Sequence, residues 1–168
     1  PYNWLGLKIK SFNGCSVDES FTNEIEKRLM LGNSTEKIEG VNQLVDIKKF
    51  HLDRIKSLFD IDFISNRLKK MKLRIFVDSM HGSAANCMAE IFASNDLEVI
   101  SEIRKDADPF FGGKPPEPLL NYVDDLNQIL MKNSTNEVKT LGIIFDGDGD
   151  RIAAIDEKGR YSSTQDLL

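Results

Sequence analysis

The sequence contains little cysteine and no long apolar segment. Only two of its 168 residues are cysteine, Cys15 and Cys87, and neither belongs to a CxxC or Cys/His pattern. This scarcity argues against a zinc site or a disulfide framework and favours a reducing compartment. No apolar run approaches the roughly 18 residues that a membrane-spanning helix needs, and the N-terminus lacks the basic-then-apolar pattern of a signal peptide. We therefore expect a cytoplasmic protein with no membrane partner.

Positive charge is also in deficit. Lysine and arginine total 22 against 27 acidic residues, which gives a formal net charge of −5. This balance gives no support to a nucleic-acid partner. Apolar residues make up 40% of the chain, enough to bury a core. The length suits one domain, or one domain with a piece of another.

What the sequence does contain is a dense acidic segment directly after an apolar one. Leu141–Phe145 leads into Asp146-Gly147-Asp148-Gly149-Asp150-Arg151. Along a regular strand Asp146 and Asp150 would lie roughly 13 Å apart, at about 3.3 Å per residue. A single ion reached by all three carboxylates therefore requires the chain to curl, and the two glycines permit it. The mutual repulsion of the carboxylates predicts a bound cation, with Mg²⁺ the first candidate because a few carboxylates hold it and leave positions for water or phosphate oxygens.

The pattern from residue 73 onward alternates between strand and helix. We expect strands over 73–77, 97–103 and 141–145, helices over 82–94 and 119–131, and then a short strand over 151–156 that turns into another. This alternation predicts an α/β fold with a mainly parallel sheet sandwiched by helices.

The N-terminal part is different. A strand end at Leu7–Lys10 and an amphipathic helix over Asp18–Leu31 precede a polar stretch, and these elements cannot bury a core of their own. A further helical segment over Phe50–Met71 is expected to be broken near Asp60. We therefore predict a partial-domain segment over residues 1–40 and one α/β domain over residues 41–168.

Four segments resemble the α-D-phosphohexomutases, the phosphoglucomutase/phosphomannomutase family. The acidic segment over 146–151 is similar to the metal loop of that family. Val77–Gly82 resembles its Asp-x-x-His-Gly segment, and Asp108–Pro118 resembles its Phe-x-Gly-x-x-Pro-x-Pro loop. Pro1–Lys8 is similar to the run that follows the catalytic Ser-His-Asn, although Leu5 stands where asparagine is usual.

The resemblance implies a role for each site residue. Asp146, Asp148 and Asp150 would be the ligands of a magnesium ion, and Arg151 would lie beside the transferred phosphoryl group. Lys8 would be an active-site lysine that moves a proton or contacts phosphate.

The resemblance also implies how the chain relates to a whole enzyme. Residues 1–40 would be the tail of the first mutase domain, and residues 41–168 the second domain. A phosphoserine of the first domain would exchange phosphoryl groups with a phosphosugar through a bisphosphosugar, interconverting hexose 1-phosphate and 6-phosphate. By this alignment the serine falls three residues before Pro1, and the third and fourth domains have no counterpart. The partners would be those domains and the phosphosugar, and the 168 residues alone are expected to be inactive.

Other patterns share parts of the acidic segment. An EF-hand loop would need glycine where Arg151 stands. A haloacid-dehalogenase-like phosphatase would use Asp146 as nucleophile and Asp148 as acid, but it usually has threonine or valine in place of Asp150. A solvated acidic loop without metal, or a non-catalytic cation-binding α/β domain, remains a further alternative.

Overall fold

A computed structural model describes residues 6–32, 40–93 and 100–167. The contacts within the chain divide it into two units, Tyr2–Val45 and Asp46–Leu168. Each unit is described by itself. The expectations for residues 1–5, for 97–99 and for the end of the helix at residue 94 fall outside the described residues.

The N-terminal unit contains one helix and one short turn. Helix α1 spans Glu19–Met30, within a residue of the expected range, and none of its residues is buried. Before it, Lys10 and Ser16 form an isolated antiparallel bridge across a turn. The strand expected over Leu7–Lys10 is limited to that single bridge among the described residues.

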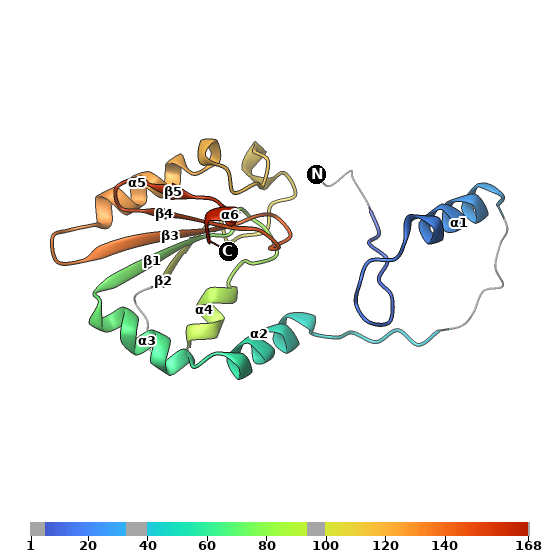
Figure 1. The fold of residues 1–168 in the computed structure, drawn as a ribbon, viewed down its shortest axis with the longest axis horizontal. Coiled ribbons are helices and arrows are strands. Elements are labelled where there is room, and N and C mark those ends of the chain that lie inside the picture. Colours follow the sequence, from blue (N-terminus) through green and yellow to red (C-terminus); the bar gives the residue numbers. More distant parts are fainter. Residues whose placement is uncertain (1–5, 33–39, 94–99, 168) are drawn as a thin grey trace. The chain divides into compact units, whose positions relative to one another are not determined.

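The second unit is built on a five-stranded sheet, with strands in the order β2-β1-β3-β4-β5 (Figure 1). Strand β1 pairs in parallel with both β2 and β3, whereas β4 pairs antiparallel with β3 and β5 antiparallel with β4. The strands are β1 (Leu73–Asp78), β2 (Ile100–Ile103), β3 (Lys139–Phe145), β4 (Ile152–Asp156) and β5 (Tyr161–Ser162). Parallel β1 and β3 therefore end at the same edge of the sheet.

Helices cover both faces of this sheet (Figure 1). Helix α5 (Asp124–Asn133) lies on one face, where Leu126 and Leu130 are completely buried at the four-residue spacing of a helix stripe. Helices α2 (Ile47–Leu58), α3 (Ile61–Lys70) and α4 (Cys87–Phe92) lie on the other face, around a second apolar cluster. The prediction of an α/β fold with a mainly parallel sheet between helices is confirmed.

Side-chain caps explain the predicted break between α2 and α3. The Asp46 carboxylate accepts a hydrogen bond from the backbone N–H of Lys49 at 2.9 Å, and Asp60 accepts one from Phe63 at 2.8 Å. Each cap satisfies an N–H group that has no partner within the first helical turn. Asp60 therefore starts a new helix instead of continuing α2.

Two helices begin later than the pattern predicts. Helix α4 begins at Cys87, because residues 79–86 form successive turns after β1. Helix α5 begins at Asp124 and is preceded by a separate 3-10 helix, η3 (Leu120–Tyr122). A short final helix, α6, spans Thr164–Leu167. Among the described residues, no helix is both long and apolar enough to cross a membrane.

Candidate metal centre

The acidic loop, residues 146–151, connects the antiparallel strands β3 and β4. The Asp146 N–H donates to the Arg151 carbonyl at 3.3 Å, and the Gly149 N–H donates to the Asp146 carbonyl at 3.2 Å. Gly149 has φ +77°, a left-handed conformation that glycine adopts without the steric cost of a side chain. The chain therefore curls at the position where the sequence requires it, and β4 follows the loop directly. An EF-hand is excluded, since a helix would have to follow instead.

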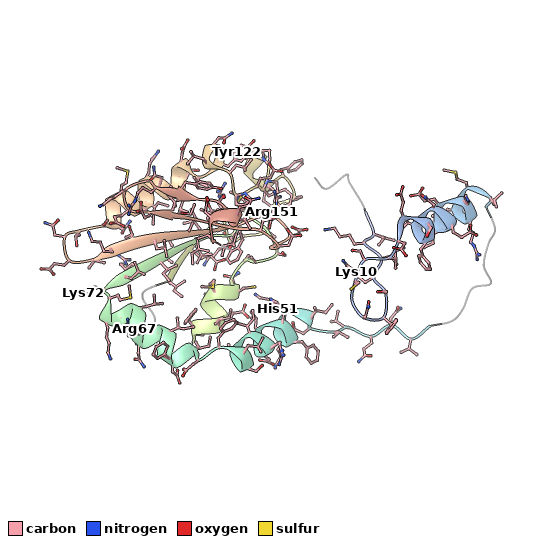
Figure 2. All side chains as sticks on the ribbon, in the orientation of Figure 1. Lys10, His51, Arg67, Lys72, Tyr122 and Arg151 are labelled. Carbon is pink, nitrogen blue, oxygen red and sulfur yellow. The ribbon has the colours of Figure 1, made fainter. Side chains whose placement is uncertain are left out.

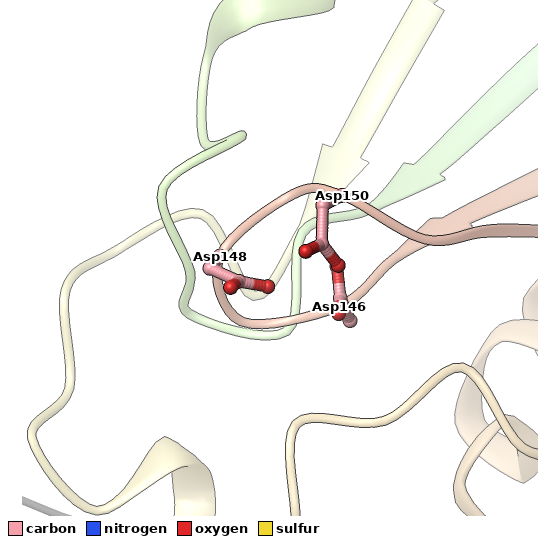
Figure 3. Close-up of side chains that lie close together, drawn as sticks. All are labelled: Asp146, Asp148 and Asp150. Carbon is pink, nitrogen blue, oxygen red and sulfur yellow. The ribbon is translucent and has the colours of Figure 1, made fainter. Parts of the chain in front are cut away.

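The curl brings the three aspartates together. One carboxylate oxygen from each of Asp146, Asp148 and Asp150 lies within 4.8 Å of the others. The carboxyl groups point toward a common centre inside the loop (Figure 3). Asp146 is 1% exposed at the base of the loop, whereas Asp148 and Asp150 are exposed at its rim. Such a set of oxygen donors, closed on one side and open to solvent on the other, suits a hard divalent cation that keeps several water ligands.

Arg151 fixes the orientation of the buried ligand. Its backbone N–H donates to Oδ1 of Asp146 at 3.0 Å, and its Nε donates to Oδ2 at 2.8 Å. Burial raises the pKa of Asp146, but these hydrogen bonds and the positive charge of Arg151 outweigh burial and hold the pKa below its usual value. The Arg151 side chain is half-exposed at the end of the sheet (Figure 2).

The outer carboxylates repel one another. The negative charge of Asp148 raises the pKa of Asp150, and burial and the charge of Asp146 add to the effect. Arg151 compensates the charge of Asp146 within the acidic loop, while the remaining negative charge is concentrated at the exposed rim. A cation at the centre of the three carboxylates would remove this repulsion, so the residues present fit a divalent metal.

Two other loops hold the acidic loop in place. The Ser83 N–H donates to the Gly147 carbonyl at 3.0 Å, and the Gly147 N–H donates to the Pro116 carbonyl at 3.0 Å. Gly82 lies against Gly147 so closely that a Cβ at Gly82 would come within 2.5 Å of the Gly147 carbonyl oxygen. Three of the four segments that resemble mutase motifs thus meet at one edge of the sheet.

The proline-rich segment over 106–118 is in turn anchored to the end of β1. The His81 ring donates through Nδ1 to the Asp106 carbonyl, with 2.7 Å between the heavy atoms. The Asp108 carboxylate accepts from the backbone N–H groups of Phe110 and Gly112, each at 2.9 Å. These two hydrogen bonds lower the pKa of Asp108. His81 therefore has a clear structural contact at the turn after β1.

A buried ion pair fixes the carboxyl ends of β1 and β2. Asp78, which is fully buried, pairs with the Arg104 guanidinium through both carboxylate oxygens. The Arg104 Nη2 that bonds Asp78 also donates to the Tyr122 carbonyl at 3.1 Å. Because the pair is bidentate and bonded further, it meets the conditions under which a buried pair is tolerated.

Comparison with known families gives this geometry its context. The model of the α/β/α domain II of phosphoglucomutase/phosphomannomutase matches residues 49–159. The chain belongs to the phosphoglucomutase/phosphomannomutase family. The matched range contains the acidic loop and both of the loops that support it. The phosphohexomutase resemblance of the sequence is thereby confirmed.

Individual relatives agree with the family. The chain is 30% identical to a probable phosphoglucosamine mutase of Methanothermobacter thermautotrophicus, over 100% of this chain and 35% of that protein. It is 26% identical to phosphoglucomutase 1 of Drosophila melanogaster, over 100% of this chain and 34% of the relative. A solved structure of a phosphoglucomutase/phosphomannomutase family protein from Burkholderia thailandensis has the same fold, with a TM-score of 0.67 at 21% identity, over 88% of this chain and 30% of that one. The chain thus spans about a third of the length of its curated relatives.

The structure brings together four of the five site residues expected from the sequence. Asp146, Asp148, Asp150 and Arg151 all belong to the acidic loop, whereas Lys8 lies in the N-terminal unit as an exposed residue. The metal-binding role of the aspartates and the roles of Arg151 and Lys8 stay predictions.

Sequence reasoning did not single out two glutamates that the structure places near this edge of the sheet. Glu117 lies 4.0 Å from the Arg151 guanidinium, and Glu102 hydrogen-bonds to the segment that supports the acidic loop. Glu117 lies at an open position of the Phe-x-Gly-x-x-Pro-x-Pro segment, and Glu102 belongs to none of the four segments. Only the fold therefore reveals their positions.

Proposed function

We propose that this chain is the metal-carrying second domain of a magnesium-dependent phosphohexomutase. The observation that carries the proposal is the convergence of three carboxylate oxygens within 4.8 Å, in a loop of the matched mutase domain. In the whole enzyme, the reaction would interconvert a hexose 1-phosphate and its 6-phosphate through a phosphoserine and a bisphosphosugar. Relatives named as phosphoglucosamine mutase and phosphoglucomutase support a hexose or hexosamine phosphate as the substrate class.

Each acidic-loop residue has a distinct part in this proposal. Asp146, Asp148 and Asp150 would hold Mg²⁺, which when bound would neutralise negative charge on the transferred phosphoryl group. Arg151 keeps the buried Asp146 carboxylate ionised and oriented. Since its side chain is half-exposed, Arg151 can also meet a phosphoryl oxygen from the solvent side.

Residues outside the acidic loop complete the proposal. Lys8 would supply a positive charge to phosphate, or move a proton of the sugar hydroxyl. The catalytic serine and the sugar- and phosphate-recognising elements would come from the other mutase domains. Because the 168 residues span about a third of the relatives, we expect no mutase turnover from them alone. Measurable interconversion of glucose 1-phosphate and 6-phosphate by the isolated chain would contradict this expectation.

The central experiment replaces one proposed metal ligand in the full-length enzyme. Asp148→Asn should lower kcat by about 100-fold or more at saturating Mg²⁺, because a lost ligand charge weakens metal-assisted phosphoryl transfer. Asp53→Asn is the matched control, since Asp53 forms an exposed pair with Lys49 on α2, and such pairs contribute little. Near-normal turnover of Asp148→Asn would overturn the metal-ligand assignment.

A further variant, Asp146→Asn, separates the mutase from a phosphatase. A haloacid-dehalogenase-like enzyme would hydrolyse a simple phosphate ester and lose that activity in Asp146→Asn. The family assignment favours the mutase, so we expect phosphoryl exchange between sugar phosphates, with no ester hydrolysis by the wild-type enzyme beyond background.

A further inference from the structure

Glu102 projects from β2 toward the segment that supports the acidic loop. Its Oε1 accepts hydrogen bonds from the Ser79 hydroxyl and from the backbone N–H of Asn86, the latter at 2.7 Å. Its Oε2 is buried and has no hydrogen-bond partner among the described residues. A carboxylate oxygen buried in this way is unfavourable, and such a group in a folded protein calls for an explanation.

The two donors to Glu102 are the ends of one short segment. We call residues 79–86 the bridging segment, because it runs from the end of β1 to the start of α4. Asn86 precedes α4 with φ +64°, and its backbone N–H has the Glu102 carboxylate as its partner. Ser79 at the other end is fully buried. One carboxylate oxygen therefore closes the bridging segment into a loop.

The middle of the bridging segment contacts the metal centre. The Ser83 N–H donates to the Gly147 carbonyl at 3.0 Å, and Gly82 packs directly on the backbone of Gly147. Gly147 separates Asp146 from Asp148 in the sequence. A second tether comes from α2, where the Lys48 ammonium donates to the Ala85 carbonyl at 3.2 Å. A movement of the bridging segment would therefore move two proposed ligands.

We propose that Glu102 is a positioning residue of the metal centre: by clamping Ser79 and Asn86 it fixes the bridging segment against Gly147 and so sets the separation of the aspartate ligands. This inference rests on the proposed metal function. Glu102 touches none of the three aspartates in any hydrogen bond of the described residues, so it acts through the backbone of the bridging segment.

The test measures Mn²⁺ binding and backbone protection in the same variants of the 168-residue chain. Free Mn²⁺ is quantified by electron paramagnetic resonance, and exchange of the Ser83 amide is followed by NMR without metal. Glu102→Ala removes both acceptor contacts and should weaken Mn²⁺ binding about tenfold, the lower end of the range for groups that orient metal ligands. The same change should accelerate Ser83 exchange, because it loosens the bridging segment.

Two further variants separate positioning from general destabilisation. Glu102→Gln keeps an oxygen that can accept from Ser79 and Asn86, so we expect near wild-type binding and exchange. Asp156→Ala is the matched control, because Asp156 also holds a turn through two backbone N–H donors, at the opposite end of β4. It should lower thermal stability without changing Mn²⁺ affinity or Ser83 exchange.

The outcomes distinguish the inference from the function on which it rests. Failure of the wild-type chain to bind Mn²⁺ would overturn the metal proposal and with it the metal part of this inference. If the wild-type chain binds Mn²⁺ and folded Glu102→Ala binds it with the same affinity, only the positioning role of Glu102 is overturned. If Glu102→Ala does not fold, Ser79→Ala removes one of the two contacts, and unchanged affinity and exchange in that variant would equally refute the role.

Discussion

The contact between Gly82 and Gly147 leads to a quantitative prediction for Gly82→Ala. The added Cβ would lie 2.5 Å from the Gly147 carbonyl oxygen, 2.8 Å from its Cα and 2.9 Å from its carbonyl carbon. All three atoms are backbone, so no side-chain rotation can relieve the overlap. Restoring ordinary van der Waals contact requires the two segments to separate by about 1 Å, which lengthens the Ser83–Gly147 hydrogen bond beyond its normal range.

The expected loss of stability follows from these two effects. Overpacking costs about 1–3 kcal/mol and the lost hydrogen bond about 1 kcal/mol, so the free energy of unfolding should fall by about 2–4 kcal/mol. For a domain of this size this corresponds to a decrease in Tm of about 8–16 °C. Because the displacement occurs at the backbone between Asp146 and Asp148, Mn²⁺ affinity should fall by about tenfold as well.

The assay pairs thermal unfolding by circular dichroism with Mn²⁺ titration at a temperature where the variant is folded. Gly142→Ala is the matched control in β3. Its Cβ would lie 2.7 Å from Ile155 Cγ2 and 2.8 Å from Leu126 Cδ2, in the core beside α5. It should destabilise the domain but leave Mn²⁺ affinity unchanged. Wild-type affinity in folded Gly82→Ala would refute the argument that the Gly82–Gly147 contact positions the ligands.

Three further predictions concern charged groups. Asp78→Ala should lower the free energy of unfolding by about 3 kcal/mol in urea titrations, because it leaves the largely buried Arg104 without its counter-ion; a loss under 1 kcal/mol would contradict this. Burial raises the pKa of Asp156, but hydrogen bonds, led by those of Arg160, lower it by more. The pKa of Asp156 therefore lies below its usual value. The stabilisation of the folded state by ionised Asp156 is therefore present above about pH 4 and is lost as pH falls through the folded pKa. The difference in the free energy of unfolding between wild type and Asp156→Ala should narrow below about pH 4. A constant difference would refute the lowered pKa of Asp156. Arg151→Ala removes the Nε hydrogen bond to Asp146 and leaves the backbone one, so it should weaken Mn²⁺ binding about tenfold. Unchanged affinity would show that Asp146 needs no side-chain support.

The fold of the second unit could be predicted because its signals are local. The apolar run of β1 and the stripe of α5 identify the strand and helix that form the core. The break near Asp60 follows from its capping side chain. The curl of the acidic loop follows from carboxylates and glycines within six residues. Each of these features depends on residues that are neighbours in the sequence.

The remaining features depend on contacts between distant segments. Helix α4 begins at Cys87 because residues 79–86 form turns. Glu102 contacts this segment through the N–H of Asn86, and no pattern near residue 86 encodes that contact. The need for glycine at 82 comes from Gly147 on another strand connection. The pairing of Asp78 with Arg104 likewise requires the parallel register of β1 and β2. The sequence therefore predicts the proposed ligands, and the fold reveals what holds them.

The acidic loop combines ligands that are close in sequence with supports that are far away. Asp146 and Asp150 lie within one five-residue stretch, so gathering them costs little loop-closure entropy. The contact between Gly82 and Gly147, however, joins the segment after β1 to the segment after β3, so it depends on the pairing of these two strands. Long-range parallel pairing is slow compared with local turn formation. We therefore expect tight metal binding to appear late in refolding, so that Mn²⁺ uptake in a stopped-flow experiment would report the completion of the sheet.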